Sequence, residues 1–143
     1  CYHGPDMNLR RARPEDIPHA VELARRLGLD YPGLEADALW VAVEAGAVVG
    51  LVALKRQPDC LELCALGVDP VRRGKGVAGA LVEALMAEAP GEVHLATVIP
   101  GFFEARGFRP ATIVPPTFPA RRDTVWCEGC ERERCTVMSR PAP

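Results

Sequence analysis

The stretch VDPVRRGKGVAG, residues 68–79, decides the fold because it joins a buried strand to a helix through a glycine-rich turn. The almost entirely apolar run before it predicts a long strand over 60–68 in the middle of a sheet. Apolar residues at helical spacing after it predict a helix over 74–89. A strand, a turn and a helix in this order form the first part of a βαβ unit.

The turn itself has residues that suit a phosphate group. The N–H groups and the dipole of a helix N-terminus attract anions, and Gly74 and Gly76 let the backbone approach a diphosphate closely. Arg72, Arg73 and Lys75 add positive charge. The turn has neither the Ser/Thr of a Walker loop nor the third glycine of a dinucleotide fingerprint. Taken alone, it is either a phosphate site or an ordinary strand-to-helix turn with solvated arginines.

Periodicity and turn residues predict further elements on both sides of this stretch. The elements before it are a strand over 7–12, a helix that opens at 14–16 and ends at Gly28, and an antiparallel hairpin of strands 39–44 and 48–54. The elements after it are a strand over 93–97, a helix over 100–106, a strand over 108–114, an extended proline-rich linker from 115 and a closing strand at 137–138. This order predicts a mixed α/β layer with a largely antiparallel start.

The composition of the 143 residues is that of one globular domain, with 48% hydrophobic and 25% charged residues. Lys and Arg number 17 against 19 Asp and Glu, and the net charge of −2 argues against a nucleic-acid or anionic-membrane partner. No apolar run approaches the ~18 residues of a membrane-spanning helix, and no signal peptide is visible. Met7 looks like a natural start, so residues 1–6 are interpreted as an extension or a scar.

The six cysteines are grouped rather than spread through the chain, which favours a reducing cytoplasm over a disulfide scaffold. Cys60 and Cys64 lie in the apolar run, and Cys127, Cys130 and Cys135 lie near the end. The spacing of the last three is typical of metal ligands, but a closed zinc site needs four. We assign no metal site from the sequence, and thiols, a disulfide formed on oxidation or a structural metal remain alternatives for this tail.

Two motifs resemble those of one known family. The pattern RxxGxA at residues 73–78, after a strand that ends in GVDP (67–70), resembles the acetyl-CoA loop of the GNAT acetyltransferase superfamily. The segment FFEARGF, residues 102–108, resembles the family's later helix-to-strand motif. The resemblance covers about residues 7–114, and two motifs in the family's order are more specific than either alone.

The resemblance implies a fold and a domain organisation. It implies a mixed, mostly antiparallel sheet of six to seven strands, about four flanking helices and a central strand pair that splays apart to admit acetyl-CoA. We expect one N-acetyltransferase domain over 7–143. Its motif-bearing core would span 7–114, and 115–143 would form the linker and the cysteine-containing tail.

Within the superfamily, three segments are similar to the short amino-acid N-acetyltransferases of the N-acetylglutamate synthase-like group. They are ELCALGV at 62–68, TVIPGFF at 97–103 and the cysteine-containing tail over 126–138. The resemblance implies transfer of acetyl from acetyl-CoA to a primary amine, most simply the α-amino group of an amino acid such as glutamate. It implies a small-molecule partner and neither a nucleic acid nor a membrane, and leaves a homodimer open.

The resemblance also assigns the acetyl-CoA site to backbone groups. Those of Leu66, Gly67 and Val68 would pair with the pantetheine arm, and an N–H near Leu66 or Gly67 would stabilise the oxyanion. The N–H groups that would hold the pyrophosphate belong to Arg73, Gly74, Lys75, Gly76, Val77, Ala78 and Gly79.

Glu62 is the candidate general base. It is the only charge between Cys60 and Val68, and strand alternation places it on one face with apolar neighbours. Desolvation of an isolated carboxylate moves it toward the range in which a base can take a proton from an ammonium group, directly or through a water. The alternative is an outward-facing glutamate that pairs with a nearby arginine.

Phe103 departs from the family, in which many members have a tyrosine here that protonates the leaving thiolate. Phenylalanine cannot donate a proton. Water, Cys64 or Tyr31 would take over this role, or the thiolate would leave unassisted. Phe102 is expected to pack in the core. Two other functions stay open: acetylation of another amine, such as an amino-acid-like toxin or a protein N-terminus, and acetyl-CoA sensing with the cysteine tail as a metal or redox element.

Overall fold

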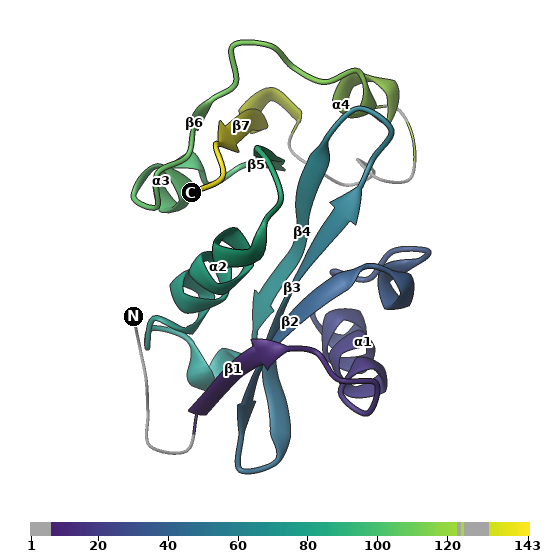
Figure 1. Ribbon diagram of the computed structural model, residues 1–143, viewed down its shortest axis with the longest axis vertical. Helices are drawn as coiled ribbons and strands as arrows, with labels where there is room; N and C mark the ends of the chain where they lie inside the picture. Colours follow the sequence, from purple (N-terminus) through teal and green to yellow (C-terminus); the bar gives the residue numbers. More distant parts are fainter. Residues whose placement is uncertain (1–6, 123, 125–131) are drawn as a thin grey trace. The chain divides into compact units, whose positions relative to one another are not determined.

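The computed structural model describes residues 7–122, 124 and 132–143, and its strands form a seven-stranded sheet in the order β1-β2-β3-β4-β5-β7-β6 (Figure 1). The pairs β1–β2, β2–β3, β5–β7 and β6–β7 are antiparallel, whereas β4 and β5 pair in parallel. Four α-helices occur in the described part of the chain. The expected fold class, a mostly antiparallel α/β sheet with about four helices, is therefore confirmed.

The chain divides into two compact units. The first unit comprises Cys1–Lys55 and Leu63–Glu88, and the second comprises Arg56–Glu62 and Ala89–Pro143. Strand β4 (Leu61–Val68) contributes its first two residues to the second unit and the rest to the first.

The first unit follows the sequence expectations closely. Its elements are β1 (Met7–Arg11), α1 (Ile17–Arg26), β2 (Ala38–Glu44), β3 (Ala47–Arg56, the last residue outside this unit), most of β4, and α2 (Val77–Glu88). The β2–β3 hairpin turns at Ala45 and Gly46, both with positive φ, of 51° and 80°. A left-handed conformation at both central residues suits a tight hairpin turn.

Alternation along β2 and β3 gives the first unit two packed faces. Leu39, Val41, Leu51 and Ala53 form one buried cluster with α1 residues such as Leu23. The opposite face meets α2: a Cβ on Gly50 would lie 3.0 Å from Leu81 Cδ1, and Trp40 Nε1 donates to Glu88 Oε2 at 2.8 Å. The two helices accordingly flank opposite sides of these strands in Figure 1. Each fully buried leucine contributes about 2 kcal/mol to folding.

The second unit contains the first residues of β4, then β5 (Val93–Thr97), α3 (Pro100–Glu104), β6 (Arg109–Pro110), α4 (Thr117–Ala120) and β7 (Thr136–Arg140). The expected strand over 108–114 is reduced to the two residues of β6, because proline has no N–H to donate to a sheet.

The expected extended linker after residue 115 is also wrong, because it contains α4. Proline is tolerated in a first helical turn, and the Asp59 carboxylate binds both the N–H and the hydroxyl of Thr117 at the start of the helix. The acceptor comes from 58 residues earlier in the chain, which no local pattern could have indicated.

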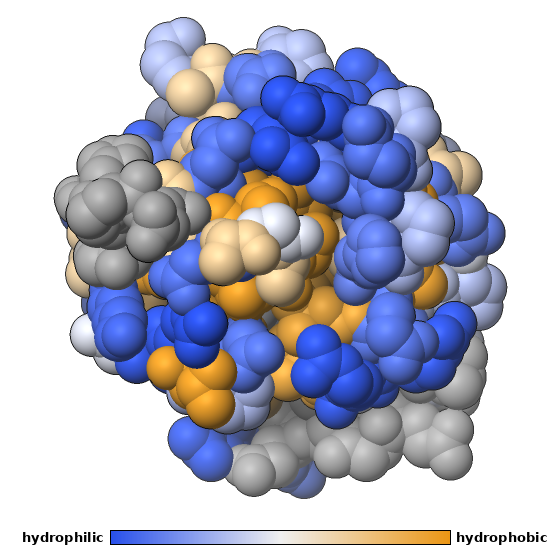
Figure 2. Space-filling view, turned by 90° about the horizontal axis from the view of Figure 1, so that it is seen from below, coloured by the Kyte–Doolittle hydropathy of each residue, from blue (hydrophilic) through white to orange (hydrophobic). Residues whose placement is uncertain are grey.

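Hydrophilic residues cover most of the face drawn in Figure 2, and apolar residues reach the surface near its centre. Four large hydrophobic side chains are exposed among the described residues, namely Val71, Ile99, Ile113 and Val114. None of the helices in the described ranges is long and apolar enough to cross a membrane.

Candidate functional site

The glycine-rich turn leads from β4 into α2, within the first unit. Helix α2 begins at Val77, later than expected, so Gly74 and Gly76 precede it with φ of 80° and 77°. Only glycine adopts this left-handed region without cost. A Cβ on Gly74 would meet no atom within 4 Å, so the backbone is open at that residue. The turn therefore fits a group that approaches the main chain closely.

The arginines of this turn stabilise its conformation. Arg73 Nε donates to the Val68 carbonyl at 3.1 Å, and the Arg72 guanidinium forms an ion pair with Glu44. Asp69 accepts a hydrogen bond from the Val71 N–H at 3.1 Å. The positive charge expected around a phosphate is therefore partly engaged within the protein, and backbone N–H groups are the main candidate donors.

Strand β4 changes its backbone conformation after Cys64. Ala65 has a φ of 52°, which costs a non-glycine residue about 1 kcal/mol. The parallel pairing of β4 with β5 comprises Leu61 with Val93 and Glu62 with His94. In the described part of the chain, β4 has no partner on β5 beyond these two pairs. The later backbone groups of β4 are therefore candidates to pair with an extended ligand.

The residues Leu66, Gly67 and Val68 all lie in the first unit, on β4. Packing favours glycine at position 67, since an added Cβ would overlap Leu29 Cδ1 and lie 2.9 Å from Leu27 Cδ1, and both leucine side chains would have to move. The absence of a side chain brings the Gly67 main chain against these leucines. Close packing therefore surrounds Gly67, near which the oxyanion donor is expected.

Tyr31 and Cys64, the two side chains considered as proton donors, both pack against the buried cluster of the first unit. The Tyr31 hydroxyl donates to Asp37 Oδ2 at 2.6 Å. Lys55 Nζ lies 3.4 Å from the same oxygen and 5.3 Å from the centre of the Tyr31 ring. Tyr31 is thus one member of a polar group with Asp37 and Lys55, which the sequence did not indicate.

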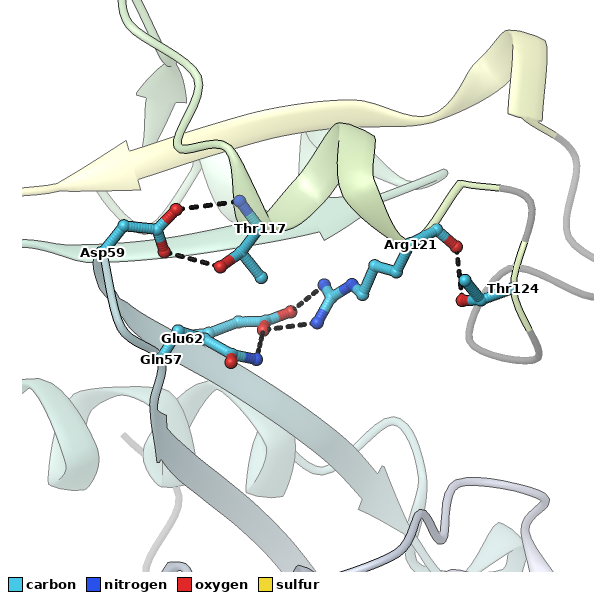
Figure 3. Close-up of polar contacts among 6 residues, drawn as sticks. All are labelled: Gln57, Asp59, Glu62, Thr117, Arg121 and Thr124. Carbon is cyan, nitrogen blue, oxygen red and sulfur yellow. Dashed lines mark hydrogen bonds and ion pairs between the residues drawn. The ribbon is translucent and has the colours of Figure 1, made fainter.

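Glu62 is buried, with 4% of its surface exposed, but it is not the isolated carboxylate that the sequence suggested. Arg121 Nη1 donates to Glu62 Oε1 at 2.8 Å, and Nη2 pairs with Oε2. Gln57 Nε2 also donates to Oε1, at 3.0 Å (Figure 3). Glu62 is therefore buried, as expected of the base, and paired with an arginine, as expected of the alternative, whereas its role as a base stays a prediction.

Arg121 is the functional candidate that sequence reasoning did not single out. It follows α4, and its backbone carbonyl accepts a hydrogen bond from Thr124 Oγ1 at 2.6 Å. Its guanidinium carbon lies 5.0 Å from the centre of the Phe118 ring. Glu62 and Arg121 are 59 residues apart, so only the three-dimensional fold brings them together.

His94 and Cys60 lie in the same unit as Glu62. His94 is in register with Glu62 and is buried beside Phe118, with a distance of 6.5 Å between the ring centres. Its Nδ1 atom is buried without a hydrogen-bond partner in the described structure. Burial, and then its hydrogen bond to Asp59, raise the pKa of the Cys60 thiol to about 12.

Phe103 is a core residue in the structure. It is 5% exposed and makes edge-to-face contacts with Phe102 and Phe108, with ring centres 4.9 and 5.6 Å apart. The expectation for Phe102 was wrong, because this ring is only half-buried and the Arg106 guanidinium lies over it at 3.8 Å. Phe103 has the core position that the sequence suggested for its neighbour.

The possible metal ligands Cys127 and Cys130 lie outside the described residues. Cys135 is exposed. Within the residues that the structure describes, no group of three or more His, Cys, Asp or Glu side chains is placed to hold a metal ion.

Comparison with known proteins identifies the family. Residues 8–108 match the model of the acetyltransferase (GNAT) family, which is more than half of the chain. This chain belongs to the GNAT family, whose cosubstrate is acetyl-CoA. The resemblance seen in the two sequence motifs is thereby confirmed.

Among individual proteins, the mycothiol acetyltransferase of Beutenbergia cavernae is 39% identical over 80 residues, which cover 56% of this chain and 25% of that protein. The chain thus spans about a quarter of this curated relative.

Two solved structures show the same fold. The N-acetylglutamate synthase of Neisseria gonorrhoeae, complexed with coenzyme A and N-acetyl-glutamate, has a TM-score of 0.74 and 21% identity, over 99% of this chain and 36% of that chain. Rv2747 of Mycobacterium tuberculosis, in complex with CoA and NLQ, has a TM-score of 0.69 and 21% identity, over 94% of this chain and 98% of that chain.

Proposed function

We propose that this chain transfers the acetyl group of acetyl-CoA to the α-amino group of an amino acid, with glutamate as the first candidate. Membership of the GNAT family supports the use of acetyl-CoA. The observation that carries the choice of acceptor and base is the composition of β4: the strand has the buried carboxylate of Glu62 near its start and a backbone interrupted at Ala65, in its middle.

Acetyl-CoA would be held by main-chain groups of the first unit. The backbone of Leu66, Gly67 and Val68 pairs with the pantetheine arm, and the N–H groups of residues 73–79 bind the pyrophosphate. The left-handed glycines at 74 and 76 support this assignment, because they leave the main chain of the turn uncovered.

Glu62 serves as the general base. The substrate's ammonium group gives one proton to the carboxylate, and the nitrogen lone pair then forms a bond to the thioester carbonyl carbon. A backbone N–H near Leu66 or Gly67 stabilises the negative oxygen of the intermediate. The C–S bond breaks with its electron pair on sulfur. The excess proton on nitrogen passes to the thiolate, Glu62 returns its proton to water, and no covalent acetyl-enzyme forms.

A water molecule, Tyr31 or Cys64 relays the excess proton to the thiolate, or the thiolate leaves unassisted and takes it up afterwards, because the buried Phe103 side chain has no exchangeable proton. Residues 7–143 act as one acetyltransferase domain in the cytoplasm. The family match over 8–108 supports this organisation, since it includes residues of both units. The grouped cysteines support a reducing compartment.

A mass-spectrometric screen tests this function. The purified chain is incubated with acetyl-CoA and a pool of amino acids and small amines, and acetylated products are identified directly. One acetylated amino acid is the expected result. Glu62→Gln should then lower kcat by about 100-fold and leave the acetyl-CoA affinity unchanged. Glu92→Gln removes an exposed carboxylate of the same unit and serves as the control.

A full rate for Glu62→Gln at every pH would exclude this glutamate as the base. The screen also covers a second candidate, an amine that is not an amino acid, because a relative at 39% identity is named as a mycothiol acetyltransferase. Binding of acetyl-CoA without any product would contradict the enzyme and favour the sensor.

A further inference from the structure

We propose that Glu62 and Arg121 together form the receptor for the charged head of an amino-acid substrate, an inference that rests on the proposed function. The substrate's α-carboxylate takes the place of Glu62 on the Arg121 guanidinium, and its ammonium group takes the place of Arg121 on the Glu62 carboxylate. One buried ion pair is thereby exchanged for two, and the total charge does not change.

The geometry of the existing pair matches this exchange. The two guanidinium nitrogens of Arg121 each bind one oxygen of Glu62, which is the fork-to-fork arrangement of arginine with a carboxylate. A substrate carboxylate presents the same two oxygens to the same planar donors. Glu62 therefore occupies the position on Arg121 that the substrate would take.

Burial makes the exchange selective. The side chains of Arg121 and Glu62 are only 14% and 5% exposed, and breaking such a buried pair is strongly destabilising unless a new partner replaces the lost one. An amine without a carboxylate would bring a second cation to Glu62 and would supply nothing to replace the Glu62 carboxylate on Arg121. A zwitterion supplies a partner for both groups, so the site favours amines that carry an adjacent carboxylate.

The surrounding contacts anchor the backbone on both sides of Arg121, so the exchange requires its side chain alone to move. Asp59 binds the start of α4 through Thr117, and Thr124 binds the Arg121 carbonyl beyond its end. The Phe118 ring lies 5.0 Å from the guanidinium and offers a cation–π contact during the movement. The contact from Gln57 keeps Glu62 oriented when Arg121 leaves. Figure 3 shows Arg121 approaching the Glu62 carboxylate from the side opposite to Gln57 and Asp59.

The exchange also explains how a paired carboxylate becomes a base. Once Arg121 binds the substrate carboxylate, the nearest cation to Glu62 is the substrate ammonium, and its proton can move to the carboxylate oxygen. The products of that step are a neutral carboxylic acid at Glu62 and a neutral amine. Arg121 is in this scheme a specificity-determining residue, and Glu62 becomes available only when the correct substrate is bound.

The test compares an amino acid with its α-amide, for example glutamate with isoglutamine, in which a neutral amide replaces the α-carboxylate. The wild-type protein should favour the acid by at least roughly 100-fold in kcat/KM. Arg121→Gln should reduce this preference at least about 10-fold, mainly through a higher KM for the acid. Arg122→Gln removes the same charge from the exposed neighbouring residue, and should keep the preference.

Three results would overturn the proposal. They are an equal kcat/KM for acid and amide in the wild type, an equal loss for both substrates in Arg121→Gln, and an unchanged preference in that variant. If Arg121→Gln does not fold, Arg121→Lys keeps the charge but loses the fork, and should lower the preference in the same way. If no amine of any kind is acetylated, the proposed function itself fails, whereas acetylation without a preference for the carboxylate rejects this inference alone.

Discussion

The side chain of Leu29 packs directly on the main chain of Gly67, in the space where any other residue would have its Cβ. Gly67→Ala should therefore lower the free energy of unfolding by about 1–2 kcal/mol, because Leu29 must move to relieve the overlap. Urea denaturation of the variant measures this loss. Since the obstructing atom is the end of a flexible side chain, the double variant with Leu29→Ala should lose less than the sum of the two single variants. Strict additivity would contradict the packing account.

Gly74 and Gly46 provide a matched pair for the acetyl-CoA site. Both have a φ of 80° and both have open space where a Cβ would be. Valine at either position should cost about 1–2 kcal/mol of stability through backbone strain alone. Gly74→Val should in addition weaken acetyl-CoA binding about 10-fold or more, because a branched side chain would stand where the pyrophosphate approaches the main chain.

Calorimetric titration of the two variants with acetyl-CoA distinguishes these effects. Gly46 belongs to the β2–β3 turn, so Gly46→Val should bind acetyl-CoA like the wild type once the folded fraction is accounted for. An equal loss of affinity in both variants would mean that general strain, rather than the turn at Gly74, is responsible.

Local patterns were sufficient to predict most elements, because the strands alternate or are continuously apolar and the helices begin and end at Pro and Gly. The hairpin of β2 and β3, the strand β5 and the helix α1 lie within a few residues of their expected positions. The exceptions are in the second unit. The helix α4 depends on Asp59, and the environment of Glu62 depends on Arg121. Both contacts join residues far apart in sequence, and a single sequence contains no signal that pairs them.

Asp16 is a buried carboxylate whose charge is compensated by Arg10. It accepts two hydrogen bonds from the Arg10 guanidinium, at 2.9 and 3.1 Å, and one from the Arg13 N–H at 2.9 Å. The hydrogen bonds from Arg10 hold the pKa of Asp16 below its usual value of 3.8. The folded state therefore binds the proton less readily than the unfolded state, and this pair stabilises the protein above the unfolded pKa.

Asp16→Asn should consequently be less stable than the wild type at pH 7, by about 2 kcal/mol. This difference in the free energy of unfolding should shrink as the pH falls below about 4 and then past the lowered pKa of the folded state, because the wild-type carboxyl becomes protonated and loses its charge. Thermal or urea unfolding at several pH values measures it. Asp30→Asn alters an exposed carboxylate near the same helix and should change stability by less than about 0.5 kcal/mol. A pH-independent difference for Asp16→Asn would contradict the ion-pair account.

Cys60 should react slowly with alkylating reagents although it is only partly buried. Burial, and then the hydrogen bond to Asp59, raise the pKa of its thiol to about 12, whereas the reactive species is the thiolate. At pH 8 its rate with iodoacetamide should be about 100-fold or more below that of the same cysteine in the urea-unfolded chain. Peptide mapping by mass spectrometry follows this residue separately from the other five cysteines.

The same shift has a consequence for stability at high pH. Because the folded pKa of Cys60 is raised, the neutral thiol stabilises the fold below the unfolded pKa near 8.5, and this contribution is lost as the pH rises toward about 12. Cys60→Ser, which does not ionise in this range, should therefore lose less stability than the wild type between pH 9 and pH 11 (roughly the window between the two pKa values). Rapid alkylation of Cys60 in the folded protein at pH 8, together with identical pH profiles of stability for the wild type and Cys60→Ser, would contradict a desolvated thiol at this position.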